Sequence, residues 1–168
     1  MIDTTNLFDG TFSAAGVPSG SAITGTRVST NTLDLLTAVD MGVANPLIIR
    51  VAVMATFLTC TSLVIQLQVC STAGGSYLVI ESSPTYPVAQ LIQGAPLFEY
   101  TLPRNQLLNS VAGVKNLPGR YLQLNYVIAG SNATAGSVMS WMAPALDRPS
   151  SVGIYAANYT AAVAAGEI

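Results

Sequence analysis

The chain has 168 residues, of which 51% are hydrophobic and only 8% are charged. This length suits one domain, because two domains would each bury too little apolar surface. The net charge is −2 with no run of either sign, and this excludes a nucleic-acid groove, since phosphate contacts need clustered Lys or Arg. A surface so poor in charge is expected to be partly covered by a partner.

Residues 1–27 are rich in Gly, Ser, Thr and Ala and have no sustained hydrophobic period. They are predicted to form an extended N-terminal arm with scattered apolar residues, namely Leu7, Phe8, Phe12 and Val17. Residues 28–168 are predicted to form a single β-sandwich domain that includes a C-terminal tail. No basic segment followed by an apolar one opens the chain, so no secretion signal is predicted.

After a short predicted strand in STNTLDL and a turn at Asn45-Pro46, the uncharged stretch 51–69 is nearly long enough for a membrane helix. However, Thr59, Thr61 and Ser62 interrupt it, and apolar residues recur at every second position on either side. The pattern therefore predicts two strands joined by a short connection, LTCTS, and no membrane span. The inward faces are predicted to carry Ile49, Val51, Val53, Ala55 and Phe57, and then Leu63, Ile65, Leu67 and Val69.

Further strands are predicted in YLVIES, LFEYTL, RYLQLNYVIAG and SVMSWMAP, with SNATAG as the turn between the last two. The proline-rich segment 84–96 is predicted to be a connection with one helical turn at Val88–Ile92. NQLLNSVAGVKNLPG is left open between a short helix and a loop, and 152–155 is a candidate for one more strand. Short strands with turns rich in Gly and Pro indicate an all-β fold, a jelly-roll-like β-sandwich.

The chain contains no histidine, so the commonest general base and the commonest transition-metal ligand are both missing. Its eight acidic residues are scattered, and solvated surface acids are a better interpretation than a glycosidase-type pair. Cys60 and Cys70 are predicted to be unpaired thiols. The aromatic residues are expected to pack in the core or between subunits. These observations predict no enzyme activity, no catalytic residue, no cofactor and no metal.

Seven segments, in this order, resemble the capsid cement (decoration) proteins of tailed phages with short tails. They are NLFDG, STNTLDL, DMGVANPLIIRVAV, TSLVIQLQVCS, PVAQLIQGAPLFEYTLP, RYLQLNYVIAG and TAGSVMSWM. The resemblance spans roughly residues 5–143 and leaves out the tail after Pro144. It implies a structural virion protein with a jelly-roll fold, made in the host cytoplasm. Such a protein binds the outer surface of the icosahedral head as a homotrimer, over contacts between subunits of the phage major capsid protein.

Within this resemblance, the extended arm has a natural role. An arm that does not fold alone can become ordered when it lies on a capsid or a neighbouring subunit. Leu7, Phe8 and Phe12 are the hypothesised apolar anchors. The alternative function is a carbohydrate-binding β-sandwich module, receptor-binding or lectin-like, but its loops would need clustered aromatic and polar side chains.

Overall fold

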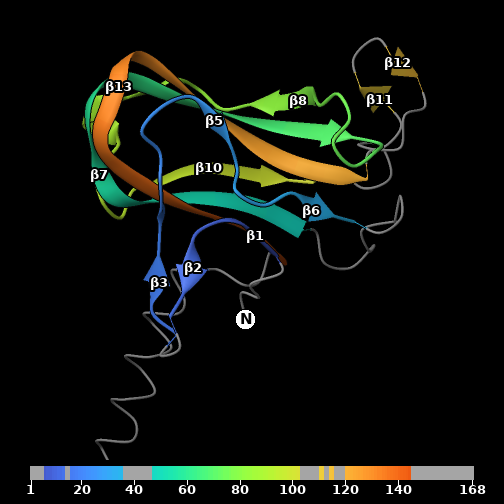
Figure 1. The fold of residues 1–168 in the computed structure, drawn as a ribbon, viewed down its shortest axis with the longest axis horizontal. Coiled ribbons are helices and arrows are strands. Elements are labelled where there is room, and N and C mark those ends of the chain that lie inside the picture. The colour runs from blue at the N-terminus through green and yellow to red at the C-terminus, as the bar shows by residue number, and fades with distance from the viewer. Residues whose placement is uncertain are drawn as a thin grey trace, which may run out of the picture.

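The computed structural model describes residues 6–13, 16–35, 47–102, 110–111, 114–115 and 120–144, which form an almost entirely β structure (Figure 1). The elements are β1 (Leu7–Asp9), β2 (Thr11–Phe12), β3 (Pro18–Ser19), β4 (Ser21–Ala22), β5 (Arg27–Val28), β6 (Leu33–Asp34), β7 (Leu47–Cys70), β8 (Leu78–Ser82), β9 (Tyr86–Pro87), the 3-10 turn η2 (Val88–Gln90), β10 (Pro96–Thr101), β11 (Ser110–Val111), β12 (Val114–Lys115) and β13 (Tyr121–Pro144). Among these residues, nine strands join one antiparallel sheet.

Two 24-residue strands, β7 and β13, form the frame of the molecule. They pair antiparallel along their length, from Tyr121 opposite Cys70 to Pro144 opposite Leu47. Both strands bend sharply midway, so the paired ribbon folds over on itself and makes two layers (Figure 1). The upper layer in that view holds β8 with the second half of β7 and the first half of β13, and the lower layer holds β10 and β1 with the remaining halves. The predicted all-β sandwich is confirmed.

The predicted turn at LTCTS is wrong, and so is the turn at SNATAG, because both segments lie inside continuous strands. Polar and small residues at these positions bend the paired strands together and do not reverse the chain. Thr59 has φ 70°, Gly130 has φ 80° and Gly136 has φ 138°, which are conformations that favour glycine. The register shifts several times between Ala129 and Val138, and the same register as before the bend is restored at Val138 opposite Val53, so irregularities in both strands accompany the bend.

The hydrophobic core lies between the two layers and follows the predicted alternation. Of the residues assigned to the inward faces of the predicted strands, all but Ala55 are buried. Ala55 is exposed because it lies at the approach to the bend, where the regular register with β13 is interrupted. Leu122, Leu124 and Tyr126 contribute the facing surface from β13. Burying alternate β-branched and aromatic side chains is the main source of stability for such a sandwich.

The N-terminal segment is not a free arm. The described residues 7–13 and 16–34, which we call the strap, contain four short strands that run antiparallel to β13, while β2 and β3 pair with each other in a separate two-stranded sheet. Its short strands β1, β4, β5 and β6 pair in turn with β13 from Trp141 back to Tyr121. The described part of the predicted arm is extended, and it pairs with the chain's own β13. The reason is that the second edge of β13 offers backbone groups that would otherwise lack partners.

The remaining predictions have mixed outcomes. The expected helical turn after Pro87 is present as η2. Within the segment left open between helix and loop, the short strands β11 and β12 pair antiparallel. The candidate strand at 152–155 lies outside the described residues. Among the helices that the structure describes, none has the length and apolar character to span a membrane.

Candidate functional site

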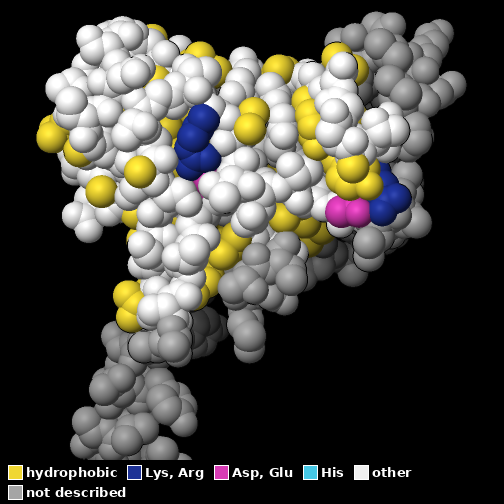
Figure 2. All heavy atoms as spheres, viewed as in Figure 1, with side chains coloured by type: hydrophobic (Ala, Val, Ile, Leu, Met, Phe, Trp, Pro, Cys, Tyr) yellow, Lys and Arg dark blue, Asp and Glu magenta, His cyan; other side chains and the backbone are white. Residues whose placement is uncertain are grey.

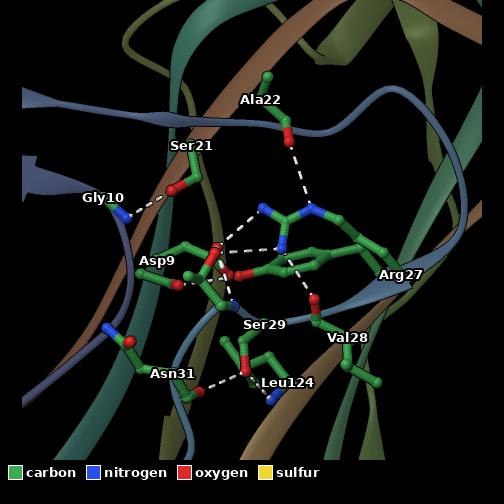
Figure 3. A network of polar contacts seen from close by, with 12 residues as sticks. Asp9, Gly10, Ser21, Ala22, Arg27, Val28, Ser29, Asn31 and Leu124 are labelled. Atoms are coloured by element: carbon green, nitrogen blue, oxygen red, sulfur yellow. Dashed lines mark hydrogen bonds and ion pairs between the residues drawn. The ribbon is translucent and has the colours of Figure 1, made fainter.

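The strap is held by a buried carboxylate, that of Asp9 at the end of β1 (Figure 3). Asp9 Oδ1 accepts hydrogen bonds from Arg27 Nη2 at 2.8 Å, Thr30 Oγ1 at 2.7 Å and the Thr30 backbone N–H at 3.1 Å. Asp9 Oδ2 is buried and accepts none within the described residues. Because a buried charge is tolerated only when it is paired, Arg27 is the residue that makes this carboxylate stable here.

Arg27 also joins separate parts of the strap to each other and to Tyr126 of β13. Its Nε donates to the Ala22 carbonyl at 3.2 Å and its Nη1 to the Val28 carbonyl at 2.8 Å, and its guanidinium lies 5.6 Å from the centre of the Tyr126 ring. The Tyr126 hydroxyl is hydrogen bonded to Ser140 Oγ at 2.8 Å. Burial raises the pKa of Tyr126 well above its ordinary value, and the negative charge of Asp9 adds to this increase. This network binds the strap in place and presents no accessible acid or base.

Two further ion pairs join residues that are far apart in the chain. Arg50 Nε lies 3.0 Å from Glu99 Oε2, between β7 and β10. Arg120 donates two hydrogen bonds to the Asp34 carboxylate, from Nε to Oδ1 at 2.6 Å and from Nη2 to Oδ2 at 2.7 Å. The hydrogen bond to Asp34 raises the pKa of Arg120. Among the residues that the structure describes, no three His, Cys, Asp or Glu side chains gather in a way that suits a metal ion. The described charges therefore act mainly between strands of this chain.

The bent end of the sandwich is a different kind of surface. We define it by the bends of β7 and β13 at residues 55–62 and 129–137 together with the neighbouring loop 91–95. These segments contain no Asp, Glu, Lys or Arg. In Figure 2, the left end of the molecule, where the long strands bend in Figure 1, shows hydrophobic and uncharged polar side chains and neither blue nor magenta.

Two large apolar side chains are exposed at this bent end. Leu58 is 53% exposed on β7, and Ile92 is 55% exposed on the loop after η2. The two segments are neighbours, because the Phe57 backbone N–H donates to the Leu91 carbonyl at 2.9 Å and the Gln93 N–H donates to Thr56 Oγ1 at 3.0 Å. The sequence did not single out these residues, since both were assigned to connections. A usable signal was present: each connection carries an aliphatic residue and no charge.

The hypothesised anchors of the arm lie in the chain's own core. Phe8 is buried in the main core between the layers, and Leu7 is buried in a second cluster with Trp141. Phe12 is partly buried and packs against that second cluster. Successive residues of a strand point to opposite faces, which is why Leu7 and Phe8 separate. With their side chains buried in this fold, Leu7 and Phe8 do not offer the exposed contact that an anchor on a neighbour requires.

Four other residues considered from the sequence are also buried. Trp141 and Tyr126 are buried, as the packing interpretation predicted, so neither presents a ring on which a sugar can stack. Tyr155 and Tyr159 lie outside the described residues. Cys60 and Cys70 are buried and unpaired, as predicted, and burial raises the pKa of the Cys60 thiol. A buried thiol with a raised pKa is a weak nucleophile.

A protein-family model described as Bbp16 matches residues 17–142, well over half of the chain. The chain belongs to the Bbp16 family. The match begins after Leu7, Phe8 and Phe12 and ends near the close of β13. This Bbp16 family member thus shares with its family the segment that contains the bent end and most of the two long strands. No curated protein matches the chain.

Proposed function

We propose that this Bbp16 family protein is a structural virion protein, a capsid cement or decoration protein. In this proposal it binds the outer surface of a phage icosahedral head as homotrimers and stabilises the contacts between subunits of the major capsid protein. The ordered sequence resemblance described above supports this function. It needs no catalytic residue, metal or cofactor.

The observation that carries the proposal is the nature of the surface. A two-layer sandwich with 8% charged residues exposes uncharged polar faces and several large aliphatic side chains, including Leu58, Ile92, Val28 and Val79. Soluble monomers usually spread charge over such faces to prevent association. A protein that is covered by its own copies and by a capsid wall has no need of that charge, because neighbours remove the surface from water.

Co-sedimentation with empty heads of the phage that encodes the chain tests the proposal. The purified protein is mixed with heads that lack it, the heads are pelleted, and bound protein is quantified against added protein. A cement protein gives saturable binding at a fixed ratio to the major capsid protein, and decorated heads resist heating better than bare heads. Failure to bind heads, with the protein folded by circular dichroism, would refute the function.

The same purified protein distinguishes the capsid-binding function from the alternative function. A carbohydrate-binding module would be retained on a glycan array and would leave the heads bare. The burial of Trp141 and Tyr126 argues against this alternative, because sugar-binding sites rely on exposed aromatic rings. Tyr77, Tyr86, Tyr100 and Tyr121 are half-buried and come from separate strands and loops.

A further inference from the structure

Asp9 precedes a glycine, and Asp-Gly is the dipeptide at which an aspartate most readily rearranges. The glycine has no Cβ to hinder the approach of its backbone nitrogen to the aspartate side chain, and it adopts unusual backbone conformations at little cost. Among all the Asp and Asn residues of the chain, Asp9 is the only one that a glycine follows. The sequence therefore contains one site that is especially prone to this rearrangement.

The rearrangement converts aspartate into isoaspartate in two steps. In the first, the Gly10 backbone nitrogen attacks Cγ of the protonated Asp9 carboxyl group. A bond forms between nitrogen and Cγ, and the carboxyl hydroxyl leaves with the amide proton as water, which gives a cyclic imide. In the second, water adds to the main-chain carbonyl carbon of Asp9 and the bond from that carbon to the Gly10 nitrogen breaks. The Asp9 Cβ is then part of the backbone, and no oxidant, reductant or cofactor is consumed.

The folded structure restrains both reacting groups (Figure 3). The Asp9 carboxylate is tied by Arg27 and by the hydroxyl and backbone N–H of Thr30, and Arg27 pairs with the ionised form, from which no hydroxyl can leave. The Gly10 N–H donates to Ser21 Oγ at 2.9 Å, so the attacking nitrogen is also engaged. Asp9 is 0% exposed and Gly10 is buried, which restricts the water that the second step consumes.

From these observations we infer that Asp9-Gly10 is a modification site, an isoaspartate site that the strap's own contacts keep closed and that reacts only while the strap is detached around it. In isoaspartate the free carboxylate is carried by the former main-chain carbon. This shifts the carboxylate away from Arg27 and lengthens the chain beside Ser140, with which Asp9 is paired. The modified strap therefore binds β13 less tightly than the native one. This inference concerns the strap alone and does not depend on binding to a capsid.

Isoaspartate formation is measured in the full chain, kept for weeks at neutral pH and physiological temperature in water labelled with heavy oxygen. Hydrolysis of the imide inserts one labelled oxygen at Asp9. After digestion with trypsin in ordinary water, the peptide that contains Asp9 is heavier, and its fragmentation distinguishes isoaspartate from aspartate. The folded wild type is compared with the same chain unfolded in guanidinium chloride, and circular dichroism verifies the state of each sample.

Three variants locate the opening that permits the reaction. Ser21→Ala removes the acceptor of the Gly10 N–H, and Arg27→Ala removes the cation paired with Asp9. Gly74→Ala is the matched control, because Gly74 lies between β7 and β8 with φ 68°, so the substitution destabilises the domain at a place outside the strap.

We expect the folded wild type to form isoaspartate about 100-fold more slowly than the unfolded chain, because the reaction must await the opening of a strap that a buried ion pair holds. Ser21→Ala should raise the rate in the folded protein about tenfold, since it leaves a buried N–H without its partner. Arg27→Ala should bring the rate close to that of the unfolded chain. Gly74→Ala should stay within about threefold of the wild type.

The inference is overturned if the folded wild type reacts as fast as the unfolded chain, or if the unfolded chain forms no isoaspartate at Asp9. It is also overturned if Gly74→Ala raises the rate as much as Ser21→Ala does, because the reaction would then follow unfolding of the whole domain. A folded Ser21→Ala protein that reacts at the wild-type rate overturns it as well, even if Arg27→Ala does not fold.

Discussion

Gly136 is the residue at which the bend of β13 is most sensitive to substitution. Its φ of 138° lies in a region that side-chain-bearing residues rarely adopt, and a Cβ placed there would lie 2.5 Å from two atoms of the Phe57 ring. Phe57 is buried in the core and has no room to retreat. Gly136→Ala should therefore distort the bend that joins the two layers.

The expected cost has two parts. Forcing an L residue into this backbone conformation costs about 1–3 kcal/mol, and overpacking the buried ring costs about 1–3 kcal/mol. Their sum, about 4 kcal/mol, is a large fraction of the 5–15 kcal/mol by which a typical domain is stable. Urea denaturation followed by circular dichroism measures it as a lowered midpoint with an unchanged slope.

Substitutions at two other glycines measure the backbone cost and the packing cost separately. Gly74 has φ 68° with nothing within 4 Å of an added Cβ, so Gly74→Ala should show the backbone cost alone, about 1 kcal/mol. Gly20 lies outside the left-handed region, but its added Cβ would lie 2.7 Å from the Met54 Cβ, so Gly20→Ala isolates the packing cost. If Gly136→Ala proves no more destabilising than Gly74→Ala, the close approach of the bend to Phe57 is refuted.

Three further predictions concern the strap and its network. Phe8→Ala should lower the free energy of unfolding of the isolated protein by about 3–5 kcal/mol, because Phe8 is a core residue; an unchanged urea midpoint would instead support a role as an external anchor. Arg27→Ala should lower the free energy of unfolding by about 3 kcal/mol, because it leaves the buried Asp9 carboxylate without its cation. Arg120→Ala removes one partner of an exposed ion pair, so it should change the urea midpoint little. Equal effects of the two variants would contradict the importance of burial. Since the pKa of Tyr126 is raised on folding, the unfolded chain releases this proton first, so the contribution of Tyr126 to the free energy of unfolding should be constant below about pH 10 and fall above it by about 1.4 kcal/mol per pH unit. Urea midpoints across this range check the slope, and a Tyr126→Phe variant with the same slope as the wild type would rule out Tyr126 as its source.

The bend of the long strands shows where the sequence was ambiguous. A polar or glycine-containing break between two alternating segments is compatible with a turn and with a bend. LTCTS and SNATAG were both assigned as turns, yet β7 and β13 are continuous strands across them and pair with each other on both sides of the bend. Local residues do not distinguish these outcomes, because the partner strand supplies the hydrogen bonds that keep the chain extended. The exposure of Leu58 was not predicted for the same reason, since it depends on the direction of the bend.

The sequence by itself determined the all-β class, the inward faces of the strands, the unpaired cysteines and the lack of charge at the connections. These follow from period and composition, which are local properties of the chain. Only the tertiary structure decided that the arm is a strap, that Leu7 and Phe8 are internal, and that Leu58 and Ile92 lie on neighbouring segments. Each of these depends on contacts between residues far apart in the chain, and such contacts are selected by the folded pairing of β13 with its neighbours, not by any single segment.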